Sequence, residues 1–107
     1  MNKIEIAKNP NTPVETLQSL ATDEDSTVRW CVARNPNTSS ETLQSLATDE
    51  NSYVRCCVAR NPKTPVETLQ TLATDEDSGV RYHVGRHSNA TELIRRLVLM
   101  TDSKLAQ

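Results

Sequence analysis

Aromatic and apolar residues are scarce in this sequence. Its 107 residues include no Phe, one Trp and two Tyr, and 36% of them are hydrophobic. No stretch approaches the roughly 18 consecutive apolar residues of a membrane-spanning helix, and none resembles the apolar part of a secretion signal. We therefore expect a soluble protein that does not associate with membranes and is located in the cytoplasm.

A strong net charge and a disulfide framework are also missing. Twelve basic and 14 acidic residues give a net charge of −2, so no overall field attracts nucleic acid. Three cysteines, two of them adjacent, do not suggest a set of disulfides and favour a reducing compartment. We see no catalytic arrangement of residues, and we expect neither enzymatic activity nor a cofactor.

What the sequence does contain is a repeat with a period of 26 residues and no gaps. Residues 33–58 read ARNPNTSSETLQSLATDENSYVRCCV, and residues 7–32 and 59–84 are close copies. A fixed period of this size predicts a solenoid, in which each unit contacts only its neighbours and the core is thin. Residues 1–6 would be an N-terminal half unit, and residues 85–107 a degenerate repeat with a C-terminal cap. Residues 1–107 would then form a single repeat domain. We expect this domain to be a monomer.

Each unit is predicted to contain two helices. The first would cover residues 13–21, 39–47 and 65–73, where apolar residues recur at helical spacing. Four pairs resemble capping boxes, in which the first residue caps the helix N-terminus: Thr12 with Glu15, Thr38 with Glu41, Thr64 with Glu67, and Asn89 with Glu92. The second segment would be shorter, begin at an N-cap such as Asp25 and end before Asn35-Pro36, as either α-helix or 3₁₀-helix.

The motif VR-x-x-V-[AG]-R-N-P-x-T-x-x-E-x-L-x-x-L-A-x-D resembles the leucine-rich repeat variant family, which is related in style to HEAT-like repeats. The resemblance extends from Ile6 to about Val98 and is weaker in the fourth unit. It implies an all-α, right-handed α-solenoid of helix–turn–helix repeats in which α-helices alternate with 3₁₀-helices, the second segment being the 3₁₀ one. One form of the family carries a cysteine-bound iron–sulfur cluster in a cysteine-rich leader ahead of its repeats, and we do not expect that property here.

Residues 26 apart form columns through such a stack. The Leu and Val columns are core. Arg29, Arg55 and Arg81 form a column that could bind anions, but we favour a ladder of ion pairs with Asp25, Asn51 and Asp77, or with Asp23, Asp49 and Asp75 of a neighbouring unit.

The cysteines lie in two adjacent columns. We expect Cys31 and Cys57 to be small buried hydrophobic residues and Cys56 to be exposed. Cys57, His83 and His87 could be assembled into a metal site, but they provide only three ligands and no CxxC occurs, so we expect no metal.

The columns that vary between units contain every aromatic residue, beside a row of arginines. We predict a partner-binding stripe on the outer side of the second segment, formed by Trp30, Tyr53, Tyr82, Arg34, Arg60 and Arg86. Trp, Tyr and Arg are enriched at binding hot spots, although large residues could also simply cover the short segment.

These observations favour a non-enzymatic repeat scaffold that binds a protein or peptide through the short-helix face. One alternative is nucleic-acid binding, with aromatic rings stacked on bases and arginines on phosphates, which the net charge disfavours. Another is a structural repeat protein with no dedicated ligand.

Overall fold

The computed structural model describes residues 2–106, which form an all-helical stack without strands. Its helices are α1 (Lys3–Lys8), α2 (Val14–Leu20), α3 (Ser26–Arg34), α4 (Ser40–Leu46), α5 (Ser52–Arg60), α6 (Val66–Leu72), α7 (Ser78–Arg86) and α8 (Glu92–Leu105). Met1 of the predicted half unit and Gln107 of the predicted cap lie outside the described residues.

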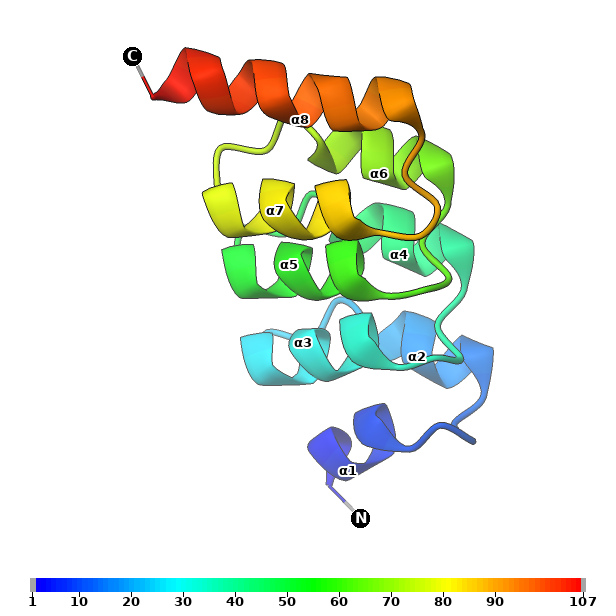
Figure 1. The fold of residues 1–107 in the computed structure, drawn as a ribbon. Helices are drawn as coiled ribbons and strands as arrows, with labels where there is room; N and C mark the ends of the chain where they lie inside the picture. The colour runs from blue at the N-terminus through cyan, green and yellow to red at the C-terminus, as the bar shows by residue number, and fades with distance from the viewer. Residues whose placement is uncertain (1, 107) are drawn as a thin grey trace.

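The helices form two layers of an α-solenoid, as predicted. Helices α1, α3, α5 and α7 lie one above the other in one layer, α2, α4 and α6 form the other, and α8 lies across the C-terminal end (Figure 1). The termini are therefore at opposite ends of an elongated molecule of 47 × 23 × 16 Å. The core lies between the layers, where Leu17, Leu43 and Leu69 of the first helices meet the valines of the second.

The second helix of each unit differs from the expectation. Helix α3 has nine residues, is α-helical, and is longer than α2, which has seven. Of the two alternatives that the sequence left open, the α-helix is therefore the one found; the 3₁₀-helix that the family resemblance implies and the expectation of a shorter second segment are wrong. The N-cap at Asp25 is confirmed, because its side chain accepts a hydrogen bond from the backbone N–H of Thr27, and Asn51 and Asp77 cap α5 and α7 in the same way.

The threonines assigned to capping boxes have a different role. Thr38 is buried, and its hydroxyl donates to the backbone oxygen of Val32 at 2.6 Å, at the C-terminal end of α3. Thr12 and Thr64 make the equivalent bonds to Ile6 and Val58. A threonine hydroxyl can accept at a helix N-terminus or donate at a C-terminus, and the turn places it against the preceding helix.

Other residues begin the first helices. Pro13 and Pro65 precede α2 and α6 without a side-chain cap, whereas Ser39 caps α4. In the fourth unit Thr91, not Asn89, caps α8.

Buried arginines connect the N-terminal ends of the second helices to the next unit. Arg29 donates from Nε to Asp49 at 2.8 Å and from Nη1 to the backbone oxygen of Asp23 at 2.8 Å. Arg55 contacts Asp75 and the oxygen of Asp49 equivalently, while Arg81 reaches Asp102 of α8. The predicted ladder is confirmed, and its acidic partners come from the following unit.

Buried amides connect the C-terminal ends of the same helices. Asn61 donates through Nδ2 to the backbone oxygens of Ala33 and Asn35, at 2.9 and 3.2 Å, and Asn35 makes the equivalent pair of bonds one unit earlier. In the fourth unit His87 takes this place: its Nε2 donates to the oxygen of Asn61 at 2.7 Å and its Nδ1 accepts from the N–H of Asn89 at 2.9 Å. Each unit thus satisfies helix-terminal carbonyls of the unit before it.

We predict that Arg55→Met lowers the free energy of unfolding by about 3–5 kcal/mol, because it leaves a nearly buried carboxylate without its partner. Asp75 is that carboxylate, with 10% of its side chain exposed. Arg96→Met is the matched control, since Arg96 forms an exposed ion pair with Glu92 and its loss should change stability by less than about 1 kcal/mol. Urea denaturation measures both, and similar changes in the two variants would contradict the ladder's structural role.

We also predict that His87→Asn is at least as stable as the parent, because asparagine makes both bonds at the equivalent positions 35 and 61. His87→Leu should cost about 1–3 kcal/mol for each buried group left without a partner. Thermal melting of the two variants compares them directly. If the Asn variant melts at as low a temperature as the Leu variant, the packing of the His87 ring, and not its hydrogen bonds, accounts for its contribution to stability.

Candidate binding face

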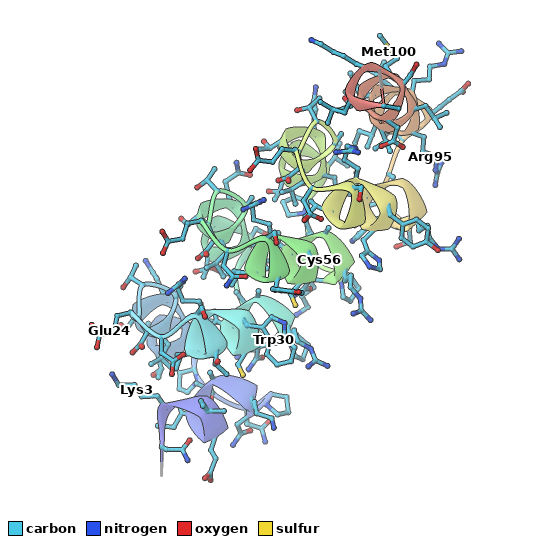
Figure 2. The ribbon with its side chains drawn as sticks, turned by 90° about the vertical axis from the view of Figure 1, so that its left-hand side faces the viewer. Lys3, Glu24, Trp30, Cys56, Arg95 and Met100 are labelled. Carbon is cyan, nitrogen blue, oxygen red and sulfur yellow. The ribbon has the colours of Figure 1, made fainter. Side chains whose placement is uncertain are left out.

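The six residues of the predicted stripe lie on α3, α5 and α7, and we call their outer side the second-helix face. Tyr53 and Tyr82 are 75% and 58% exposed, and the three arginines are exposed. Trp30 is only partly exposed and packs against the core, so its predicted place on the outer side, away from the core, is only partly correct. Trp30 and Cys56 occupy equivalent places on α3 and α5 (Figure 2).

Two arginines of the face lie over aromatic rings one helical turn away. The Arg34 guanidinium is 4.5 Å from the centre of the Trp30 ring, and that of Arg86 is 5.4 Å from the centre of the Tyr82 ring. Such cation–π contacts favour defined positions for flexible side chains. Trp30 also lines a hollow of about 280 Å³ together with Tyr53 of the next unit. The structure therefore brings the stripe together in two groups, one around Trp30 and one around Tyr82.

A row of cations at the C-terminal ends of the second helices was only partly recognised from the sequence. We define the basic row as Lys8, Arg34, Arg60 and Arg86. Successive members line three hollows of about 170, 140 and 240 Å³ between adjacent units. Lys8 was missed, although its position 26 residues before Arg34 is a signal that the period provides.

Opposite charges gather at the two ends of the second helices. Within residues 2–106 no member of the basic row forms an ion pair, and no Asp or Glu lines its three hollows. The acidic turns before α3, α5 and α7 lie at the other end, where their aspartates serve as helix caps and ladder partners. The second-helix face is therefore locally basic in a protein with a net charge of −2.

The hypothetical metal site of Cys57, His83 and His87 does not form. Nε2 of His87 carries a proton that it donates to a backbone oxygen, and the lone pair of Nδ1 accepts a backbone N–H, so neither nitrogen is available to a metal. No group of three His, Cys, Asp or Glu among the described residues is arranged to hold a metal ion. His83 lines the hollow between Arg60 and Arg86. Its pKa is lowered mainly by burial and, to a smaller extent, by the positive charges of these two arginines.

The three cysteines are free thiols with different exposure. Cys31 and Cys57 are buried, as predicted, with 3% and 6% of their surface exposed. Cys56 is not exposed as expected but half-buried, because it packs against the edge of the core. Burial raises the pKa of all three, that of Cys57 to about 11.

We predict that Cys56 is alkylated first and Cys57 last at pH 8. The thiolate is the reactive species, and with its pKa near 11 only about a thousandth of Cys57 is ionised at that pH. Mass spectrometry of the native protein, with Cys56→Ser and Cys57→Ser variants to separate the adjacent residues, measures the order. Equal rates at all three cysteines would contradict these environments.

None of the helices described here is both long and apolar enough to cross a membrane. The family model for the leucine rich repeat variant matches residues 54–77, which run from α5 through α6 to the turn before α7. No curated protein and no solved structure matches the chain. The matched segment recurs in the neighbouring copies of the repeat. The chain is therefore a helical repeat protein in which residues 54–77 are similar to the leucine rich repeat variant.

Proposed function

We propose that this protein is a non-enzymatic scaffold that binds a partner protein or peptide through the second-helix face. The observation that carries the proposal is the placement of its scarce aromatic residues. The one Trp and both Tyr lie on this face, and two of them lie beneath arginines. Residues that only covered the helices would be expected to repeat from unit to unit, as the core Leu and Val do.

The chemistry of the face is suited to protein recognition. Trp, Tyr and Arg are the residues most enriched at binding hot spots, and Tyr53 and Tyr82 leave large rings in contact with water. Arginines already positioned over rings lose less conformational freedom on binding, which favours affinity. Solenoids generally bind through an extended surface formed by one helix layer.

Nucleic acid is the second candidate, because the basic row and the aromatic residues could contact phosphates and bases. Against it stand the net charge of −2 and the acidic turns at the far end of the same helices. We further propose that the protein acts as a monomer in a reducing compartment such as the cytoplasm, since its three cysteines are unpaired.

We predict that the double variant Tyr53→Ala, Tyr82→Ala folds like the parent but binds its partner more weakly by more than about 2 kcal/mol. Both rings lie outside the core, so their loss leaves packing intact. Trp30→Ala should weaken binding too, but it should also lower the free energy of unfolding because Trp30 packs against the core. The measurements are thermal melting and the affinity for a partner isolated by affinity capture and then purified.

The matched control is Leu93→Ala, Leu99→Ala, which removes two exposed apolar side chains from α8, a helix that carries none of the six stripe residues. We expect parental affinity. If only the leucine variant lost binding and the tyrosine variant did not, the binding site would lie on the C-terminal helix α8 and not on the second-helix face. Unchanged affinity in both double variants would exclude the aromatic residues as the docking site.

A further inference from the structure

The basic row is a set of cations that lie outside the ion pairs and hydrogen bonds of the described fold, although Arg34 and Arg86 contact aromatic rings. The buried arginines of the same helices, Arg29, Arg55 and Arg81, are each bonded to an aspartate and to a backbone oxygen. In contrast, the side chains of the basic row make neither ion pairs nor hydrogen bonds with other residues of the described chain.

Carbonyl capping does not explain these cations either. A basic residue at a helix C-terminus often caps the last carbonyl groups. Here Asn35, Asn61 and His87 already donate to backbone oxygens at these helix ends. The attraction of each cation to the helix dipole contributes only about 0.3–1 kcal/mol. This attraction also does not account for the hollows that lie between successive cations. The row is thus available to an external anion.

The hollows define where the anionic groups would lie. Each hollow of the row is flanked by cations of two successive units and is closed on one side by the turn after the second helix. Arg34 and Arg86 are held over their rings, so two of the three guanidinium groups are already positioned. A planar guanidinium binds a carboxylate through two parallel hydrogen bonds. A carboxylate in one of these hollows could be bound in this way by one arginine while the second cation of the hollow attracts it.

The spacing of the stack identifies the kind of chain that fits. Packed helices lie about 8–10 Å apart, so the hollows recur at about that distance along the row. The side chains of a β-strand alternate between its two sides, but a polyproline II helix has three residues per turn with a rise of about 3.1 Å each. Every third side chain of such a peptide therefore falls on the same side at about 9–10 Å.

We propose that the basic row binds an extended acidic segment of a partner protein with an Asp or Glu at every third residue, one carboxylate in each hollow. This inference rests on the proposed function, since it specifies the partner of the second-helix face. A narrow peptide following the row stays away from the acidic turns at the other end of α3, α5 and α7, which would repel a broader polyanion.

The test uses the whole chain and short synthetic peptides at fixed low salt. One peptide repeats Ala-Glu-Pro three times; the second has the same composition with the three glutamates adjacent; the third probe is an oligothymidylate of equal charge. We expect the periodic peptide to bind at least about tenfold more tightly than the other two, measured by fluorescence anisotropy, because only it places a charge-assisted contact in every hollow.

Two double variants remove the same charge from different places. Arg34→Gln, Arg60→Gln should weaken binding of the periodic peptide by at least about tenfold. Arg96→Gln, Lys104→Gln on α8 is the control and should leave the affinity within about twofold. Both variants change exposed side chains, and their melting temperatures verify that each is folded.

His83 provides a readout of whether a carboxylate occupies one particular hollow. It lines the hollow between Arg60 and Arg86, and both cations lower its pKa. A carboxylate bound in this hollow should raise that pKa, which an NMR titration detects, whereas the control peptide should have a smaller effect.

Equal affinity for the two peptides, or no binding of either, would overturn the proposal. Tighter binding of the oligothymidylate, lost in the row variant, would replace it with nucleic-acid binding. If the peptides fail while an identified partner still requires Tyr53 and Tyr82, the acidic-segment inference is wrong and the proposed function stands. If that partner is also insensitive to both tyrosines, the proposed function fails as well.

Discussion

The stack depends on buried polar side chains that reach from one unit into the next. Arg55 is bonded to Asp75 of the following unit, and Asn61 donates to the backbone oxygens of Ala33 and Asn35 in the preceding one. A unit on its own would leave these groups without partners, at a cost of about 1–3 kcal/mol each and more for a charge. The stability of each unit is therefore tied to its neighbours, as in other solenoids.

The same polar connections distribute charge over the surface. At the N-terminal ends of the second helices, Asp49 and Asp75 are engaged with buried arginines. At the C-terminal ends, asparagines and one histidine donate to backbone oxygens, and the basic row forms no ion pair with the described residues. The surface at the C-terminal ends of the second helices is therefore locally basic, although the protein has a net charge of −2.

The sequence by itself determined the architecture and much of the candidate site. The period places Leu and Val in columns, and their spacing predicts which residues are buried, because helical periodicity is a local property. The N-caps of the second helices could also be predicted from the sequence, since Asp25 accepts a hydrogen bond from a backbone N–H only two residues away. The aromatic residues and arginines were assigned to one face by the same periodicity. The boundaries between units come from the repeat period alone.

Only the tertiary structure decided which atoms meet across units. Thr38 looked like an N-cap but bonds to the preceding helix, and Trp30 and Cys56 turned out to pack against the core. His87 offered metal-binding chemistry in the sequence, yet both of its nitrogens are used by backbone groups, one of them 26 residues away. The choice of Asp49 as the partner of Arg29, over the other candidate acids, follows from contacts between residues 20 positions apart. Such choices depend on how the units stack, and stacking distances are not encoded in any local pattern of residues.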